Sequence, residues 1–284
     1  MPARTHLPVA ARCRVVVDND WAGDPDGLVA LAHHLLSPAN RVTAVTSSFL
    51  NPVFGDVDGT AARGAAMAQE LVDLVGGTQR PPVHVGSEAA VGTADGRSAA
   101  SEAIVAEARR DDDLPLFLVC AGPLTNVAAA LEAAPDIAGR LTLVWVGGSL
   151  DPEAYEYNRD TDPRAAEQVL GRSDLAVRQF PLETYRRCAY SVAELEHDLA
   201  GSGRLGAWLW QRFLELPLPG WITLGGVWPL GDSPPVLVTA LGDESSTWTT
   251  TGSPQRRVYT DVDVRLLFGD MLARLRLHER IATS

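Results

Sequence analysis

Short apolar runs alternate with amphipathic helical patterns along the first two thirds of the chain. Runs typical of buried strands, most of them rich in β-branched residues, lie at residues 14–17, 42–46, 83–85, 116–120, 141–146 and 175–177. Between them, apolar positions recur at helical spacing over residues 28–36, 60–75, 101–110, 124–133 and 163–170. This alternation predicts an α/β fold, an open and mostly parallel sheet with helices on both faces.

The last third of the chain has a different pattern. Helical spacing covers residues 192–199 and 205–216, and a loop rich in Pro, Gly and Trp follows at 217–235. Residues 247–250 and 257–260 predict a small hairpin, and residues 262–278 predict a final amphipathic helix. We find no linker, repeat or low-complexity segment, so residues 1–284 are predicted to form a single domain with a C-terminal helical region.

Composition and charge narrow the function classes. Hydrophobic residues make up 46% and charged residues 21% of the chain, as in ordinary globular proteins. The formal net charge of −12 disfavours a nucleic-acid surface or an anionic membrane surface, because both need clustered positive charge. No apolar stretch is long enough to cross a membrane and no signal peptide is recognisable, which predicts a cytoplasmic protein.

Two residue types exclude further chemistry. Every basic side chain is Arg, so a Schiff-base lysine and a P-loop lysine are both excluded. The three cysteines, Cys13, Cys120 and Cys188, are far apart and disfavour a zinc cluster or a disulfide framework.

An acidic loop follows the first predicted strand. Asp18, Asp20, Asp24 and Asp26 lie within nine residues, where a parallel strand ends and a helix begins. Ligand sites of open α/β sheets form at such carboxyl ends. Carboxylates this crowded repel one another unless protons or a cation are present, and oxygen ligands favour Ca²⁺ or Mg²⁺. The alternative, an Asx turn with Asp24 or Asp26 as the helix cap, explains one or two of the four aspartates.

Two known types of acidic loop do not fit. An EF-hand loop starting at Asp18 would place Ala22 at position 5 and Val29 at position 12, where a bidentate Glu is needed. The Asp-x-Asp pattern after a strand also resembles haloacid-dehalogenase-type phosphatases. These normally need a downstream Lys, which this chain lacks.

A third interpretation takes in motifs along nearly the whole chain. Residues 122–126 read GPLTN directly after the predicted strand 116–120, and residues 146–148, 156–158 and 162–166 read VGG, EYN and DPRAA. With the acidic loop, they resemble the inosine–uridine-preferring nucleoside hydrolase family, which has D-x-D-x-G-x-D-D, GPLTN, MGG, EFN and DPxAA in this order. The resemblance extends from residue 15 to about residue 267. It implies a Rossmann-related nucleoside hydrolase fold.

The resemblance also implies an activity and a cofactor. Members hydrolyse the N-glycosidic bond of ribonucleosides in purine or pyrimidine salvage, with one Ca²⁺ that activates water and anchors the ribose. Asp20 would bind Ca²⁺ and accept the proton of the water. The other metal ligands would be an aspartate of the Asp24/Asp26 pair, the backbone carbonyl of Thr125, and Asp232. Members are usually homo-oligomers, which implies a dimer or tetramer here.

The resemblance assigns the substrate contacts to other side chains. Glu156 and Asn158 would hydrogen-bond the ribose, Asn158 mainly at the 5′ side and near the ring. Asn51 and Asp26 would help to place the sugar or the water, and Asp18 would orient the site. Each position has a plainer alternative: a solvated loop for Glu156 and Asn158, a turn for Asn51 and Pro52, and a helix cap for Asp232.

The chain departs from the family pattern at two glycines. Against the loop variant D-x-D-x-x-x-D-x-D-D, the last aspartate is replaced by Gly27. Gly231 stands where inosine–uridine-preferring members carry the His that is the usual candidate for protonating the leaving base. Some purine-preferring members lack this acid and stack the base between tryptophans, and Trp21, Trp221 and Trp228 are the candidates here. This favours a purine or otherwise noncanonical nucleoside.

The two glycines keep two rival functions open. The first is a nucleoside- or ribose-binding protein that retains the scaffold without turnover. The second is a hydrolase of a different N- or O-riboside.

Overall fold

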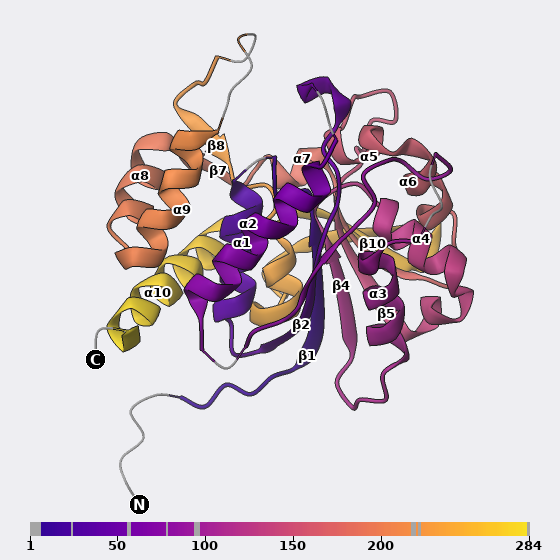
Figure 1. Ribbon diagram of the computed structural model, residues 1–284, viewed down its shortest axis with the longest axis horizontal. Helices are drawn as coiled ribbons and strands as arrows, with labels where there is room; N and C mark the ends of the chain where they lie inside the picture. Colours follow the sequence, from indigo (N-terminus) through magenta and orange to yellow (C-terminus); the bar gives the residue numbers. More distant parts are fainter. Residues whose placement is uncertain are drawn as a thin grey trace, which may run out of the picture.

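The main sheet has eight strands in the order β3-β2-β1-β4-β5-β6-β10-β9 (Figure 1). This computed structural model describes residues 7–23, 25–55, 58–77, 79–93, 97–216, 220 and 223–282. The strands are β1 (Cys13–Asn19), β2 (Asn40–Ser47), β3 (Val83–Val85), β4 (Leu116–Cys120), β5 (Leu141–Val146), β6 (Ala176–Phe180), β9 (Thr247–Thr251) and β10 (Ser253–Asp261). Only the β9–β10 pair among these neighbours is antiparallel. The predicted open, mostly parallel sheet is therefore confirmed.

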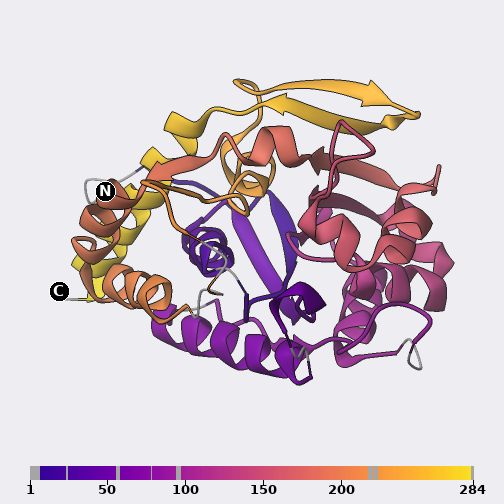
Figure 2. The same ribbon diagram turned by 90° about the horizontal axis from the view of Figure 1, so that it is seen from above.

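Helices cover both faces of this sheet (Figure 2). Val15 and Val17 of β1 pack into one buried cluster and Val16 into the other, because side chains alternate across a strand. The first cluster is covered by α1 (Asp26–Leu36), α2 (Thr60–Val75), α8 (Val192–Ala200), α9 (Gly203–Glu215) and α10 (Val264–Ala282). The second is covered by α3 (Ala99–Arg109), α4 (Thr125–Ala133) and α6 (Pro163–Leu170). This two-sided burial explains why the central strands read as continuous apolar runs.

The strand order fixes where a ligand site can form. From β1 the chain moves to β2 and β3 on one side, and β4, β5 and β6 extend the sheet on the other. The carboxyl ends of β1 and β4 are therefore the switch point of this sheet, the place where the ligand-binding crevice of such sheets is expected. Asp18 is paired with Cys120 across these two strands, and the Ala121 amide donates to the Asp18 carbonyl at 3.0 Å.

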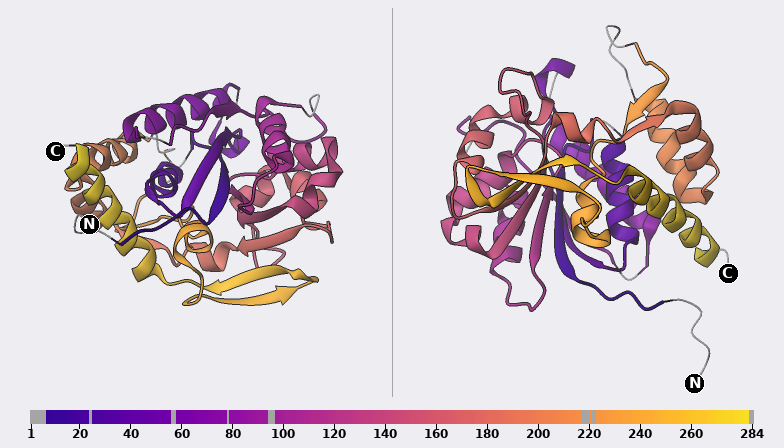
Figure 3. Two further views of the ribbon diagram at one scale, coloured as in Figure 1. Left: turned by 90° about the horizontal axis from the view of Figure 1, so that it is seen from below. Right: turned by 180° about the vertical axis from the view of Figure 1, so that it is seen from behind.

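The C-terminal third differs from the sequence expectation in its pairing. The predicted hairpin is part of the main sheet, because β10 pairs in parallel with β6 and leaves β9 at the edge (Figure 3). The predicted loop 217–235 contains β8 (Val227–Pro229), which pairs with β7 (Ala189–Ser191). β7 and β8 have the sequences AYS and VWP, which are not rich in β-branched residues, and these strands depend on their tertiary partner.

Several short helices were also absent from the sequence expectation. They are α5 (Tyr157–Thr161), α7 (Leu182–Tyr185), η1 (Pro52–Phe54) and η2 (Pro135–Arg140). A further short helix, η3 (Leu237–Leu241), lies within the apolar run at residues 236–241 that follows Asp232. α5 and α7 matter most here, because they carry Tyr157, Asn158 and Tyr185. In the described part of the chain, no helix is both long and apolar enough to span a membrane.

Candidate active site

Asp18 joins three elements at the carboxyl end of β1. Its carboxylate is fully buried, and Oδ1 accepts hydrogen bonds from Thr46 Oγ1 at 2.5 Å and Asn126 Nδ2 at 2.8 Å. Burial raises the pKa of Asp18 to about 6, and these two hydrogen bonds oppose the shift. Asp18 therefore links β1, β2 and α4 at the base of the crevice, and Asn126 of the GPLTN segment is one of its partners.

Asp20 is connected to Asn51 through a tyrosine that the sequence did not identify. The Tyr157 hydroxyl donates to Asp20 Oδ2 at 3.1 Å and accepts from the Asn51 amide at 3.2 Å. Burial raises the pKa of Tyr157, so its hydroxyl stays protonated and acts as the donor to Asp20. Tyr157 belongs to the EYN motif, and its place between Glu156 and Asn158 was the available signal.

The Asn51 side chain is occupied by contacts within the surrounding loops. Its Nδ2 donates to Thr161 Oγ1 at 2.8 Å and to the Tyr155 hydroxyl at 3.2 Å, and its Oδ1 accepts from the Val53 amide at 2.9 Å. Asn51 thus fastens the segment after β2 to α5. The turn predicted at Asn51 and Pro52 is present as η1.

Asp26 and Asp232 meet although they are far apart in the sequence. The Asp232 amide donates to Asp26 Oδ2 at 3.0 Å, and Asn19 Nδ2 donates to Asp232 Oδ2 at 2.8 Å. Asp26 is the first residue of α1, and the N-cap position of that helix is taken by Pro25. The capping alternative is therefore wrong for Asp26.

Gly27 leaves room for the Asn19 side chain. A Cβ atom at position 27 would lie 2.3 Å from Asn19 Nδ2 and 3.1 Å from Asp232 Oδ2. Where the sequence lacks the last aspartate of the loop, the Asn19 amide therefore occupies the space. Asn19 was missed from sequence because its partner comes from a segment beyond residue 230.

The carboxylates supply oxygen ligands, which are the type that a hard divalent cation takes. Asp20 and Asp26 are 8% and 4% exposed, and both lie with Asp232 at this end of the sheet. Across the residues that the structure describes, no three His, Cys, Asp or Glu side chains are grouped closely enough to hold a metal ion. Asp24 lies outside the described residues. The donor chemistry thus fits Ca²⁺, whereas the described side chains do not complete a site by themselves.

Thr125, whose carbonyl is one of the predicted metal ligands, is the first residue of α4. Its side chain is buried and donates from Oγ1 to Asp162 Oδ2 at 2.7 Å. Asp162 also caps α6 by accepting from the Ala165 amide at 3.1 Å. The GPLTN and DPRAA motifs are therefore in direct contact.

Glu156 is buried and accepts four hydrogen bonds. Oε2 accepts from the Gly148 amide at 2.6 Å and the Arg159 amide at 2.9 Å, whereas Oε1 accepts from the Asn158 amide at 3.2 Å and the Tyr185 hydroxyl at 2.9 Å. Burial raises the pKa of Glu156, and the hydrogen bonds oppose that shift. With 1% of its surface exposed, Glu156 is not part of a solvated loop, so that alternative is wrong.

Asn158 presents an unused acceptor at the same place. Its Nδ2 donates to the Ala121 carbonyl at 3.0 Å and the Val146 carbonyl at 2.9 Å, just beyond β4 and at the end of β5. Its Oδ1 is buried and has no hydrogen-bond partner among the described residues. Buried polar atoms are nearly always satisfied in proteins, so this oxygen is available to accept a hydrogen bond.

The described tryptophans named as stacking candidates are packed in the core. Trp21 is 1% exposed and donates from Nε1 to the Thr46 carbonyl at 2.8 Å. Trp228 is 8% exposed, and its ring meets Phe213 edge-on at a centroid distance of 5.4 Å. Trp221 lies outside the described residues.

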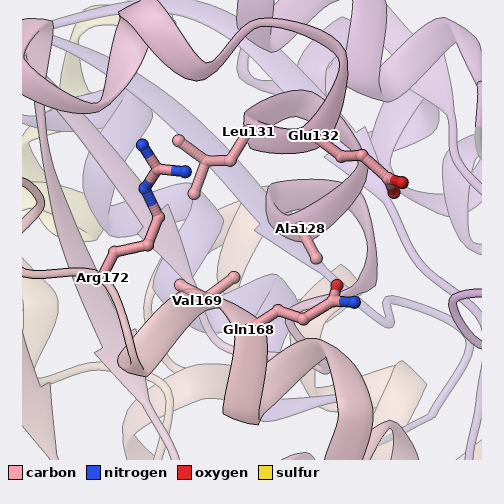
Figure 4. A pocket seen from close by; sticks show the side chains of 6 residues that line it. All are labelled: Ala128, Leu131, Glu132, Gln168, Val169 and Arg172. Carbon is pink, nitrogen blue, oxygen red and sulfur yellow. The ribbon is translucent and has the colours of Figure 1, made fainter.

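A surface cavity lies elsewhere, between α4 and α6 (Figure 4). It has a volume of about 290 Å³ and is lined by Ala128, Leu131, Glu132, Gln168, Val169 and Arg172. None of the predicted site residues lines it. The cavity and the buried polar residues therefore point to different places for the functional site. We place the site at the crevice, because the buried polar groups are concentrated there.

Comparison with known proteins gives one family over most of the chain. Residues 15–264 match the sequence profile described as "Inosine-uridine preferring nucleoside hydrolase". A pyrimidine-specific ribonucleoside hydrolase RihA from Enterobacter sp. (strain 638) is 27% identical over 191 residues, which cover 60% of this chain and 61% of the relative. The uncharacterized protein C1683.06c of Schizosaccharomyces pombe is 27% identical over 229 residues, or 69% of this chain and 71% of that protein.

Solved structures support the same fold. A purine-preferring ribonucleoside hydrolase from Gardnerella vaginalis has a TM-score of 0.72 at 21% identity, covering 94% of this chain and 99% of the other. An inosine-guanosine nucleoside hydrolase has a TM-score of 0.70 at 20% identity, covering 94% and 98%.

Proposed function

The chain belongs to the inosine-uridine preferring nucleoside hydrolase family, and from this membership we propose that it hydrolyses the N-glycosidic bond of ribonucleosides. The products are ribose and a free base. The alignment with the Enterobacter hydrolase spans only 61% of that protein's length. The proposed activity therefore rests on the family and on the residues of the crevice together.

One observation carries the proposal, the unused acceptor of Asn158. Its amide nitrogen is held by two strand-end carbonyls, and its oxygen is buried with no partner in the described part of the chain. A hydroxyl-bearing ligand supplies the missing donor. Glu156 lies beside it and is joined to the Asn158 amide, so the pair offers acceptors for the hydroxyls of a ribose.

In this mechanism, residues of the crevice act on the attacking water and on the ribose. Asp20 accepts the proton of the attacking water, whose oxygen bonds to the anomeric carbon. The bond from that carbon to the base nitrogen breaks, and its electron pair leaves with the base, which takes up a proton from solvent because Gly231 supplies no acid. Glu156 and Asn158 hold the ribose, and such contacts strengthen when the sugar flattens toward an oxocarbenium ion.

Calcium is the cofactor that we propose for this reaction. Asp20, Asp26, Asp232 and the carbonyl of Thr125 would hold it, together with Asp24, which the structure does not describe. A bound Ca²⁺ would lower the pKa of a water molecule and anchor ribose hydroxyls. The oxygen-only donor set supports this choice of cation.

The test is release of ribose from a panel of purine and pyrimidine nucleosides, with Ca²⁺ and with a chelator. We expect release that the chelator abolishes and that added Ca²⁺ restores. Purines or noncanonical nucleosides are expected to be the better substrates. Release that is insensitive to the chelator overturns the calcium proposal but leaves the hydrolase.

The second candidate is a ribonucleoside-binding protein without turnover. It is favoured by Gly27 and Gly231, the two positions at which the chain departs from the family pattern. Saturable binding of a nucleoside without release of ribose would support this function. A homo-oligomer remains a prediction, which sedimentation of the purified protein checks.

A further inference from the structure

Tyr185 stands between the two sides of the crevice. It is the last residue of α7, and its hydroxyl donates to Glu156 Oε1 at 2.9 Å. Its ring packs against the backbone at Gly231, where a Cβ atom would lie 3.1 Å from Tyr185 Cδ2 and 3.7 Å from Cγ. A single side chain therefore contacts both Glu156 and the residue before Asp232.

The backbone keeps Tyr185 and Gly231 at a fixed spacing. The Cys188 amide donates to the Tyr185 carbonyl at 3.0 Å, and the Leu230 amide donates to the Cys188 carbonyl at 2.8 Å. Because these bonds link the α7 turn to the segment that enters position 231, neither side can move away freely. A methyl group at position 231 would push on the ring and not on a mobile chain end.

The two oxygens of Glu156 are not held equally. Oε2 is fixed by two backbone amides at 2.6 and 2.9 Å. Oε1 has one backbone amide at 3.2 Å, and the Tyr185 hydroxyl at 2.9 Å is its closer donor. The position of Oε1 therefore depends on Tyr185 more than on any other described residue.

We propose that Tyr185 is a positioning residue that fixes Glu156 Oε1 for ribose binding, and that Gly231 is required because it admits the Tyr185 ring. This inference rests on the proposed function, since ribose is the ligand that Glu156 would hold. A side chain at position 231 would act on the substrate indirectly, through the ring and the hydroxyl of Tyr185.

The test is a double-mutant cycle of Y185F, G231A and the combined variant. Y185F removes only the hydroxyl, and G231A displaces the ring by a few tenths of an ångström. We expect Y185F to raise KM about tenfold with kcat within about twofold, because one hydrogen bond to a charged group is lost. G231A should raise KM by less, because a shift of the ring weakens the same bond without removing it. The combined variant should show no larger KM than Y185F, since G231A acts only through the contact that Y185F has already removed.

Tyr190 provides the matched control. Its hydroxyl donates to Asp198 Oδ2 at 2.7 Å, away from the crevice, so Y190F deletes the same kind of hydrogen bond. Y190F should leave KM unchanged. Additive KM effects of Y185F and G231A, or equal effects of Y185F and Y190F, would overturn the proposal.

Urea unfolding of the wild type, Y185F, G231A and the combined variant separates this proposal from the proposed function. Non-additive stability changes in Y185F and G231A show that the contact exists whether or not any nucleoside is cleaved. If the wild-type protein cleaves no nucleoside, the proposed function fails while the contact stands. If it cleaves one and Y185F keeps the wild-type KM, only the role of Tyr185 fails.

Discussion

Replacing Glu156 with Gln tests whether this carboxylate binds the substrate. The substitution keeps the size of the side chain and turns one acceptor oxygen into an NH₂ donor. Four donors now surround the group, two at each oxygen. The amide of Gln must therefore face at least one donor pair with its own hydrogens.

The hydrogen bonds around Glu156 determine which orientation of the Gln amide loses less unfolding free energy. With the nitrogen at the Oε2 position, the amides of Gly148 and Arg159 both lose their acceptor, a cost of about 2–6 kcal/mol for two buried donors. With the nitrogen at the Oε1 position, the Tyr185 hydroxyl can rotate and accept, so only the Asn158 amide is left unsatisfied, at about 1–3 kcal/mol.

Removal of the buried charge offsets part of this cost. Burial raises the pKa of Glu156, which means that the folded state disfavours its charged form. We therefore expect E156Q to lose only about 1–2 kcal/mol of unfolding free energy. The loss of a charged acceptor for ribose should lower kcat/KM about 10- to 100-fold.

The assay combines urea unfolding with ribose release, and E183Q is the matched control. Like Glu156, Glu183 is a carboxylate that accepts hydrogen bonds, but it lies on α7 and is exposed. It accepts from Ser149 Oγ at 2.6 Å and from the Leu150 amide at 3.0 Å. E183Q should change neither quantity appreciably. A stable E156Q protein with wild-type kcat/KM would refute the reasoning, because Glu156 would then have no contact with the substrate.

Three further predictions follow from other parts of the molecule. D20N should lower kcat at least about 100-fold, as expected for loss of a general base, while its urea midpoint stays near wild type; full activity would remove Asp20 from the mechanism. G27A should destabilise the fold by about 1–3 kcal/mol because its Cβ would meet Asn19 Nδ2 at 2.3 Å, and N19A should relieve that strain in the double variant, as urea unfolding checks. Burial lowers the pKa of His34 to about 3, so the unfolded chain takes up the proton first as pH falls below about 6.5, and the folded state loses stability. Between pH 8 and pH 5, wild type should lose about 2 kcal/mol more unfolding free energy than H34L, and equal losses would contradict this assignment.

The strands of the sheet were predictable because of where they lie. The ranges predicted for the central strands β4 and β5 agree with the structure at both ends, as does the range predicted for the edge strand β3. Central strands that are buried on both faces carry uninterrupted apolar runs, and the loops after them carry the polar residues. β7 and β8 could not be found in this way, since their sequences AYS and VWP are not rich in β-branched residues and the two strands pair with each other.

Some residues of the candidate site could likewise be predicted from the sequence, and others could not. Asp20, Glu156 and Asn158 stand in the acidic loop and the EYN motif, so the sequence pointed to them. Asn19 and Tyr185 belong to no motif, and their meaning depends on partners 213 and 29 residues away. Only the fold shows that these side chains reach Asp232 and Glu156.

The two glycine departures have a physical explanation in these same side chains. From the sequence, Gly27 and Gly231 are losses: a missing carboxylate and a missing acid. In the structure, each glycine accommodates a side chain from another segment, Asn19 at Gly27 and Tyr185 at Gly231. Both replacements are hydrogen-bonded to a carboxylate of the crevice. A chain that had merely lost its function would have no need to fill both spaces with groups that hold Asp232 and Glu156 in place, so the packing favours a rebuilt site over a decayed one.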